Sequence, residues 1–278
     1  MDRHDQRLLT DQLLPALLAA GRLEMAYFDA GCTVETKADF SPVTIADQQA
    51  ETLIVAALAA ILPGCAVVAE EAFAAGARPS LTDPFALVDA LDGTKQFISG
   101  HREFTINIAL VSGGRPVYGL VYAPALGELL VTDGPGRALR ARMLPAAAVA
   151  SLQAADPKRI QVAPSTGGIV ALQSRSRNLE ISNGYLEAFA VRERRQLGSS
   201  YKFCLIAAGE ADLYPQLGDT REWDTAAGQA ILEAAGGVVT ALDGSPLTYG
   251  KAAADFLNSA FVASSAPLAQ LKLPALES

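Results

Sequence analysis

The chain has 278 residues, half of them hydrophobic, so it can form one large domain or two smaller ones with sizeable cores. Its 30 acidic residues outnumber the 22 basic residues, and the net charge of −8 argues against a binder of nucleic acid polymers or acidic membranes. A small anionic substrate remains compatible with this charge, because it needs only a local basic pocket or a bound metal ion.

The cysteines and histidines are too few and too scattered for several kinds of site. Cys32, Cys65 and Cys204 fit neither zinc-ligand spacing nor a disulfide framework, and we interpret them as small core residues in a reducing cytosol. Because His4 and His101 are the only histidines, a histidine-based triad or metal site is not expected.

Two features of the sequence bear on location. The N-terminal residues lack the apolar core of a signal peptide. The most apolar stretch, residues 54–69, is interrupted by Pro63-Gly64 and is too short to cross a bilayer. We therefore expect a cytoplasmic protein without a transmembrane segment, and peripheral contact with the inner membrane stays open.

Two helices are predicted near the N-terminus. Apolar residues at helical spacing predict a helix over residues 5–30, in which Pro15 marks a kink or a late start. Residues 37–44 are predicted to form a loop that ends in the helix N-cap Thr44. Asp47 follows three residues later, as in a capping box, so a second helix should extend from there to the next Pro-Gly pair.

Downstream of these helices, short apolar runs predict strands, and helical periodicity returns later in the chain. The predicted strands are residues 66–69, 85–88, 104–111, 116–122, 169–173, 192–197, 211–214 and 237–241. The predicted helices of this part are residues 178–190, 199–209 and 224–235. The Gly-, Pro- and Ala-rich residues 134–158 predict a boundary between an α+β domain, residues 1–150, and an α/β domain, residues 151–278.

Acidic residues stand at the ends of three predicted elements. Glu70 and Glu71 end a strand, Asp89 and Asp92 follow another, and Asp224 opens a helix. An ordinary structural role is open for each: a solvated turn, an Asp-Gly turn and a helix cap. The alternative is a metal site, because paired carboxylates repel each other and a hard divalent cation removes that repulsion. Spacing alone does not decide between these interpretations.

Three short motifs resemble the metal-site motifs of the inositol monophosphatase superfamily, in their usual order and separation: VVAEE (67–71), DALDGT (89–94) and WDTAAG (223–228). The similarity covers most of residues 35–262 and includes KADFSPVTIAD (37–47), EFTINIAL (103–110), VYAP (121–124), SRS (174–176) and GSSYKFCLIAAGEADLYP (198–215). KADFSPVT and GSSYKFC are similar to the bacterial 3'(2'),5'-bisphosphate nucleotidases of this superfamily.

The resemblance implies a cofactor of two or three Mg²⁺ ions held by oxygen ligands. It assigns Glu70, Asp89 and the Leu91 carbonyl to one ion, and Asp89, Asp92 and Asp224 to the second. Carboxylates, a backbone carbonyl and waters suit Mg²⁺ chemically. The N-terminal domain would then hold most of the metal ligands, and the C-terminal domain Asp224 and the nucleotide contacts.

The resemblance also implies catalytic roles. Thr94 and Asp47 resemble the relay that orients and deprotonates the attacking water. Gly93 and Thr94 resemble a helix N-terminus whose N–H groups contact the phosphate. Ala90 stands where the family usually has Pro, and this change should loosen the loop without removing a ligand.

Substrate contacts are expected from both domains. The full set that the resemblance implies is Glu70, Leu91, Asp92, Gly93, Thr94, Ser174, Arg175, Ser199, Lys202, Arg221 and Asp224. Lys202 and Arg221, with Arg175 as a third candidate, are the cations expected to meet a second phosphate. Lys202 carries the strongest expectation, because apolar residues surround it on a helix that should be buried.

The implied fold is a layered αβαβα sandwich with the site between its two halves. The implied enzyme is a lithium-sensitive Mg²⁺-dependent nucleotidase of sulfur assimilation, a monomer or homodimer. It would convert adenosine 3',5'-bisphosphate, and also its sulfated form 3'-phosphoadenylyl sulfate if the site accepts it, by removing the 3'-phosphate. Two alternatives stay open: an inositol or sugar monophosphate phosphatase, and a protein that binds nucleotide or phosphate without catalysis.

Overall fold

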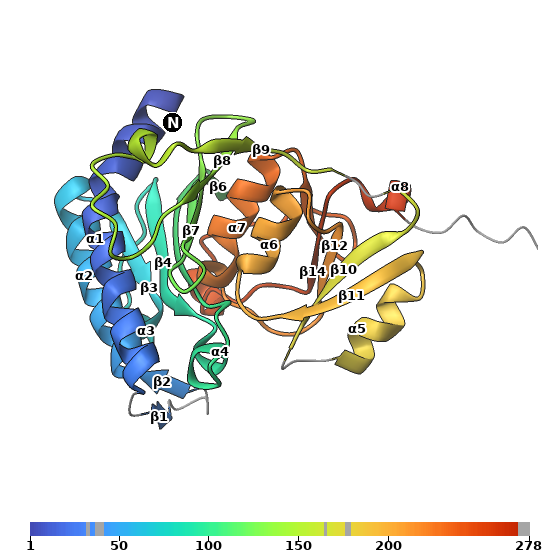
Figure 1. The fold of residues 1–278 in the computed structure, drawn as a ribbon, viewed down its shortest axis with the longest axis horizontal. Coiled ribbons are helices and arrows are strands. Elements are labelled where there is room, and N and C mark those ends of the chain that lie inside the picture. The colour runs from blue at the N-terminus through green and yellow to red at the C-terminus, as the bar shows by residue number, and fades with distance from the viewer. Residues whose placement is uncertain (32–33, 37–41, 164–165, 176–178, 272–278) are drawn as a thin grey trace, which may run out of the picture.

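The computed structural model describes residues 1–31, 34–36, 42–163, 166–175 and 179–271. These residues form two main sheets with helices outside and between them, in the order helices, sheet, helices, sheet, helix (Figure 1). The predicted αβαβα sandwich is therefore confirmed. Among the described helices, none combines the length and the apolar character needed to cross a membrane.

The first layer consists of α1 (Arg3–Ala30) and α2 (Ile45–Ile61). The helix α1 runs through Pro15, so the predicted late start is wrong. The helix α2 begins as predicted, with Thr44 as N-cap and Asp47 completing the capping box.

A short hairpin precedes α2. It pairs β1 (Val34–Thr36) with β2 (Pro42–Thr44) in antiparallel register. The loop predicted for residues 37–44 is thus wrong for its last three residues, and residues 37–41 lie outside the described residues, as does Cys32. Sequence patterns missed this hairpin because its strands are short.

The second layer is a seven-stranded sheet with the order β3-β4-β5-β6-β7-β8-β9. Its strands are β3 (Ala66–Ala69), β4 (Phe85–Asp92), β5 (Thr105–Ser112), β6 (Arg115–Ala123), β7 (Glu128–Thr132), β8 (Ala138–Arg142) and β9 (Lys158–Ile160). Only β3 and β4 run parallel; the other neighbours are antiparallel. The sheet extends to Ile160, and the predicted domain boundary near residue 150 stays a prediction.

The side chains of β4 alternate between two cores, as the two-residue period of a strand requires. Ala86 and Val88 pack with the α1 and α2 layer. Phe85 and Leu87 face the opposite core, which includes α6 and α7. By this alternation Asp89 follows Leu87 onto the inner face of the sheet, toward the centre of the sandwich.

The end of β4 differs from the prediction. The strand was expected to end at Val88, but it continues to Asp92, with an irregularity in its pairing to β5 between Asp89 and Asp92. Gly93, at a φ of 95°, then forms the N-cap of α4 (Thr94–Ile98). That left-handed conformation favours glycine, and it lets the chain pass directly from strand to helix.

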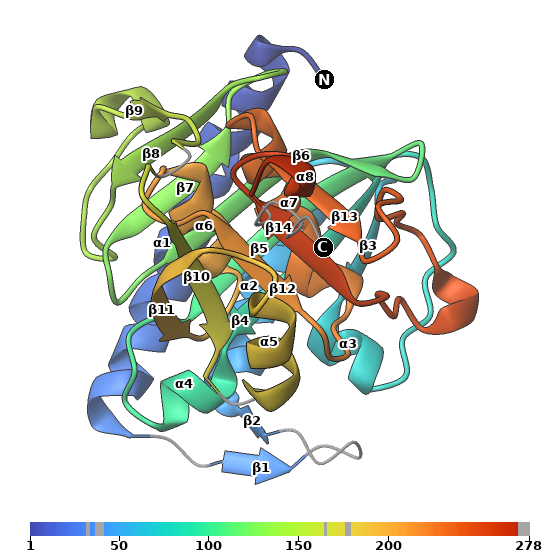
Figure 2. The same cartoon turned by 90° about the vertical axis from the view of Figure 1, so that its right-hand side faces the viewer.

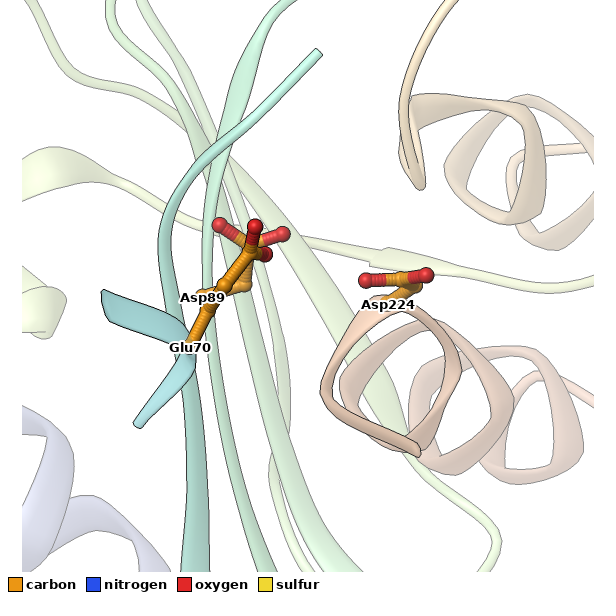
Figure 3. A group of neighbouring side chains, drawn as sticks. All are labelled: Glu70, Asp89 and Asp224. Carbon is orange, nitrogen blue, oxygen red and sulfur yellow. The ribbon is translucent and has the colours of Figure 1, made fainter. Parts of the chain in front are cut away.

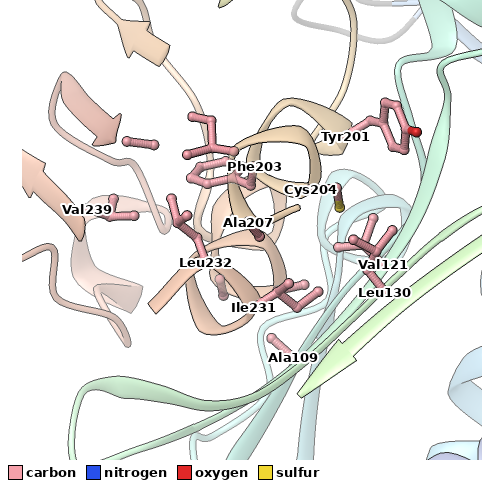
Figure 4. Close-up of a cluster of buried hydrophobic side chains, with 14 of the residues drawn as sticks. Ala109, Val121, Leu130, Tyr201, Phe203, Cys204, Ala207, Ile231, Leu232 and Val239 are labelled. Atoms are coloured by element: carbon pink, nitrogen blue, oxygen red, sulfur yellow. The ribbon is translucent and has the colours of Figure 1, made fainter. Parts of the chain in front are cut away.

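The central helices, α6 (Tyr201–Ala207) and α7 (Glu222–Ala234), lie between the two sheets. Figure 4 shows how Val121 and Leu130 of the large sheet approach Cys204 and Ile231 of these helices. The approach of α7 to β6 requires Gly119, because a Cβ there would come within 2.8 Å of the Ala230 Cβ.

The fourth layer is a five-stranded sheet with the order β11-β10-β12-β14-β13. Its strands are β10 (Ile169–Ser174), β11 (Val191–Leu197), β12 (Leu213–Gln216), β13 (Val238–Ala241) and β14 (Phe261–Ser264). The helix α5 (Leu179–Leu186) covers its outer face and lies on the viewer's side in Figure 2. Shorter helical segments are α3 (Glu70–Ala74), η1 (Leu152–Ala155), η2 (Ala252–Ala254) and α8 (Leu268–Leu271).

Most predicted elements of this half match the observed ones within two residues at each end. The helix predicted for residues 178–190 is too long, because α5 ends at Leu186 and β11 begins at Val191; residue 178 lies outside the described residues. The strand β14 was not predicted. At the edge of this sheet, β11 carries the charged residues Arg192, Glu193, Arg194 and Arg195.

Candidate active site

Three carboxylates from three elements meet at one point. Glu70 begins α3 directly after β3, Asp89 lies on β4, and Asp224 is in the first turn of α7. One oxygen from each lies within 4.8 Å of the others. Figure 3 shows Glu70 and Asp89 facing Asp224 across the space between the sheet and α7. Glu70 and Asp89 lie side by side because Ala69 of β3 pairs in parallel with Val88 of β4, and each carboxylate follows its paired residue.

Backbone and indole N–H groups orient the three carboxylates. The Trp223 Nε1 donates to Glu70 Oε2 at 3.1 Å, and the Leu91 amide donates to Asp89 Oδ1 at 3.0 Å. The Arg221 amide donates to Asp224 Oδ2 at 2.8 Å. Arg221 is the N-cap of α7 and Asp224 is the third helical residue of the capping box, so the N-cap role expected for Asp224 is wrong.

The three carboxylates fit a hard divalent cation. Carboxylates this close repel one another, and the repulsion is strong because Asp89 is only 4% exposed. An all-oxygen donor set suits Mg²⁺. Glu70, Asp89 and Asp224 are therefore the residues that would hold the ion.

Asp92 is half-buried beside this group but does not belong to it among the described residues. Its Oδ2 accepts hydrogen bonds from Asn107 Nδ2 at 3.3 Å and from the Ser200 amide. Burial raises the pKa of Asp92, whereas the charge of Lys202 and the Ser200 N–H act to lower it. The assignments of Asp92 and the Leu91 carbonyl as metal ligands stay predictions.

Asp47 and Thr94 are in direct contact across α2 and α4. The Thr94 Oγ1 donates to Asp47 Oδ1 at 2.9 Å. The other oxygen, Asp47 Oδ2, accepts from the Thr44 amide at 2.8 Å and from the Thr44 hydroxyl at 2.6 Å. Asp47 Oδ2 thus caps α2, whereas Asp47 Oδ1 accepts the hydrogen bond from Thr94. The capping role and the relay role are therefore compatible in one residue.

Glu24 of α1 is a further carboxyl group near the relay. It is fully buried, and neither of its oxygens has a hydrogen-bond partner within the described part of the chain. Burial, and secondarily the negative charge of Asp47, raise the pKa of Glu24 well above its ordinary value. The folded protein therefore keeps this carboxyl group protonated where an exposed glutamate is ionised.

Replacing Glu24 with glutamine should change how stability depends on pH. Above about pH 4.5, the ordinary value for glutamate, the unfolded chain loses a proton that the folded chain retains, so the wild type loses stability as the pH rises. Glu24→Gln has no such proton. Its free energy of unfolding should therefore rise relative to that of the wild type by up to about 1.4 kcal/mol per pH unit, until the pH reaches the folded-state pKa of Glu24. Urea unfolding from pH 4 to pH 8 measures this difference.

The exposed Glu187 offers the matched control. Glu187→Gln makes the same substitution on the surface and is unfolded over the same pH range. If the difference between Glu24→Gln and the wild type did not change with pH, Glu24 would not be a buried acid that stays protonated.

Glu103 links two of the predicted substrate residues to the N-terminal half. It accepts the Arg175 Nη2 at 2.7 Å through its carboxylate and the Ser199 hydroxyl at 2.6 Å through its backbone carbonyl. Ser199 adopts a φ of 51°, a conformation uncommon outside glycine. The Ser174 hydroxyl contacts Gln216 Oε1 at 3.1 Å. The third residue of the SRS motif lies outside the described residues.

Lys202 is buried as predicted, with 3% exposure. Its Nζ donates to the Ser199 carbonyl at 2.7 Å and to the Leu197 carbonyl at 3.4 Å, and it lies 4.8 Å from the centre of the Tyr214 ring. Arg221 is half-buried, and its Nη1 donates to the Asp255 carbonyl at 2.6 Å. Both cations thus donate hydrogen bonds to backbone carbonyl groups. Their contact with a substrate stays a prediction.

Two residues that orient the acidic groups were missed by sequence reasoning. Trp223 contacts Glu70, and Asn107 contacts Asp92. The signal for Trp223 was its position as the single tryptophan of the chain, directly before Asp224. The signal for Asn107 was a polar residue in the middle of an apolar strand, where it is 1% exposed.

Comparison with known proteins gives concordant findings. Residues 5–271 match the family model described as the inositol monophosphatase family. The 3'(2'),5'-bisphosphate nucleotidase CysQ of Escherichia coli K12 is 36% identical over 255 residues, which cover 91% of this chain and 98% of that protein. The corresponding protein of Salmonella typhimurium is 37% identical with the same coverage.

Solved structures agree with these sequence matches. CysQ from Bacteroides thetaiotaomicron, a bacterial member of the inositol monophosphatase family, superimposes with a TM-score of 0.77 at 33% identity, over 94% of this chain and 98% of that one. The IMPase of Thermotoga maritima gives a TM-score of 0.72 at 26% identity, over 90% and 89% of the two chains.

Proposed function

The chain belongs to the inositol monophosphatase family, and we propose that it is a Mg²⁺-dependent 3'(2'),5'-bisphosphate nucleotidase. The proposed reaction removes the 3'-phosphate of adenosine 3',5'-bisphosphate and gives AMP and phosphate. The observation that carries the proposal is the three-carboxylate cluster with the Asp47–Thr94 pair in the same inter-layer region. Similarity over nearly the whole length to relatives named as nucleotidases supports the choice of substrate.

In this proposal Glu70, Asp89 and Asp224 hold two or three Mg²⁺ ions, with Asp92 and the Leu91 carbonyl as further ligands. When bound, Mg²⁺ supplies positive charge that polarises the phosphoryl group and stabilises the leaving oxygen. N–H donors fix the orientation of these carboxylates: backbone amides donate to Asp89 and Asp224, and the Trp223 indole donates to Glu70.

Thr94 and Asp47 supply the proton path. The Thr94 Oγ1 donates to Asp47 Oδ1, so its lone pairs are available to accept a proton from the attacking water. As the water attacks phosphorus in line with the leaving 3'-oxygen, its proton passes to Thr94 and the threonine proton passes to Asp47. Such positioned proton transfer typically contributes roughly 10²–10⁴-fold to the rate.

The proposal also covers the surroundings of the enzyme. Cys65 and Cys204 are free thiols in the described chain, which supports a reducing, cytoplasmic location. We propose a monomer or homodimer that acts on a small phosphorylated nucleotide.

Activity across a substrate panel tests the proposal. With Mg²⁺ present, kcat/KM for adenosine 3',5'-bisphosphate should exceed that for inositol 1-phosphate by about 10- to 150-fold, the range of one charge-assisted contact to a second phosphate. EDTA should remove the activity. The panel also includes 3'-phosphoadenylyl sulfate, fructose 1,6-bisphosphate and AMP.

The panel separates the alternatives. A preference for inositol 1-phosphate or fructose 1,6-bisphosphate would make the protein a sugar phosphatase. Phosphate release from none of the substrates, with Mg²⁺ and a folded sample, would make it a binding protein.

A further inference from the structure

A segment from the connection between β13 and β14 contacts the start of α7. This segment, residues 249–258, is called the α7 collar below. The Glu222 amide donates to the Phe256 carbonyl at 2.9 Å, and the Asn258 Nδ2 donates to the Arg221 carbonyl at 2.8 Å. The N-cap and the first helical residue of α7 are therefore fixed to a part of the chain that lies well beyond the end of the helix.

A buried ion pair joins the same two parts. The Glu222 side chain is 0% exposed, and its carboxylate accepts from the Gly250 amide at 2.7 Å and from the Lys251 amide at 2.9 Å. The Lys251 Nζ lies 2.8 Å from the same carboxylate, and its side chain is 29% exposed. A buried carboxylate is tolerated only when it is paired and hydrogen-bonded, so removing the lysine would leave an uncompensated charge beside the first turn of α7.

Glu222 is the first member of a polar stripe on α7. Thr225 and Gln229 follow at helical spacing, so the three side chains lie along one side of the helix, and each is at most 1% exposed. The Asn258 Nδ2 donates to Thr225 Oγ1 at 2.9 Å, and the Tyr249 hydroxyl donates to Gln229 Oε1 at 2.6 Å. The collar thus contacts the stripe over about two turns of the helix.

The metal-site carboxylate of α7 lies on the opposite side from this stripe. At 3.6 residues per turn, Asp224 is rotated by about 200° from Glu222 around the helix axis. Figure 3 shows Asp224 at the start of α7, facing Glu70 and Asp89. Apolar packing of the helix is non-directional, whereas hydrogen bonds require a defined distance and angle. A slide or rotation of α7 would break the collar contacts, so these contacts determine where the Asp224 carboxylate lies.

We propose that the Glu222–Lys251 ion pair and the α7 collar position Asp224 for metal binding. They set the register of α7 and thereby the distance from the Asp224 carboxylate to the other two carboxylates of the cluster. This inference rests on the proposed Mg²⁺-dependent function and deepens it, because it assigns a role to residues outside the cluster. Partners that orient metal ligands typically contribute roughly 10- to 100-fold to metal affinity.

Calorimetric titration with Mg²⁺ alone, on enzyme first stripped of metal and without substrate, tests the proposal. Lys251→Met removes the ammonium group but keeps most of the side-chain volume. It should raise the dissociation constant for Mg²⁺ by about 10- to 100-fold. Lys158→Met makes the same substitution at a 73% exposed lysine paired with Asp156, and this matched control should bind Mg²⁺ as the wild type does.

Two further variants separate positioning from folding. In the double variant Glu222→Gln/Lys251→Met neither charge remains, and the glutamine oxygen can still accept from the collar amides, so most of the Mg²⁺ affinity should return. Tyr249→Phe removes only the hydroxyl that contacts Gln229, and it should weaken Mg²⁺ binding in the same direction as Lys251→Met. Thermal unfolding in EDTA measures the stability of each variant separately from its metal affinity.

Unchanged Mg²⁺ affinity in Lys251→Met and Tyr249→Phe would overturn the proposal, and a loss of thermal stability alone would make the collar a support of the fold. A double variant that binds Mg²⁺ no better than Lys251→Met would also overturn it. These results would leave the proposed function intact. Conversely, the expected differences in Mg²⁺ affinity, combined with no phosphate release from any nucleotide, would refute the nucleotidase function alone.

Discussion

Asp89→Asn should lower kcat by about 10³-fold or more, because metal-ion charge stabilisation contributes several kcal/mol to catalysis. Asp89 is the buried member of the three-carboxylate cluster, and its oxygens lie close to both Glu70 and Asp224. Asparagine has the same shape but no charge, so the loss reports on charge rather than on packing. Phosphate release at saturating substrate and Mg²⁺ measures the effect.

One control and two companion variants accompany Asp89→Asn. Asp243→Asn changes an exposed aspartate in the turn after β13 and should leave kcat unchanged. Glu70→Gln and Asp224→Asn should be severely impaired as well. If Asp89→Asn kept more than a tenth of the wild-type kcat, Asp89 would not be a shared metal ligand.

Thr94→Ala should lower kcat by about 10²–10⁴-fold, the range for positioned proton transfer, with a much smaller change in KM. The reason is that the Thr94 Oγ1, 2.9 Å from Asp47 Oδ1, is assigned to orienting the water, an interaction made mainly in the transition state. Thr94→Ser keeps the hydroxyl and should keep most of the activity. Steady-state kinetics on metal-saturated enzyme separate kcat from KM.

The outcomes for Thr94 are distinct. An unchanged kcat in Thr94→Ala would reduce the residue to the first turn of α4. A rise in KM alone would make it a substrate contact that acts equally before and during the reaction.

Local features were predictable from the sequence because all the interacting residues lie within one turn. Thr44 and Asp47 are three residues apart, and their capping box was expected from that spacing and observed. The end of β4 was not predictable in this way. The Asp-Gly turn signal favoured an early end of the strand, whereas pairing with β5 continues past an irregularity to Asp92.

The site itself required long-range information. Asp47 and Thr94 are 47 residues apart, and their pairing came from family resemblance rather than from spacing. The burial of Lys202 followed from its apolar neighbours, but the carbonyls that receive its ammonium depend on how the chain enters α6. Lys251 belongs to no pattern that marks an ion pair. Its contact with Glu222 arises only when the connection between β13 and β14 packs against the start of α7.

The charged strand β11 has a consequence for the behaviour of the protein at high concentration. In the described chain β11 pairs only with β10, so its other edge exposes backbone groups to which a strand of another molecule could add. Arg192, Glu193, Arg194 and Arg195 occupy the middle of this edge. A second copy docking there would strip water from these charges and bring guanidinium groups together, which disfavours fibre-like growth. The charges thereby protect against aggregation a sheet edge whose backbone groups could otherwise pair with a strand of another molecule.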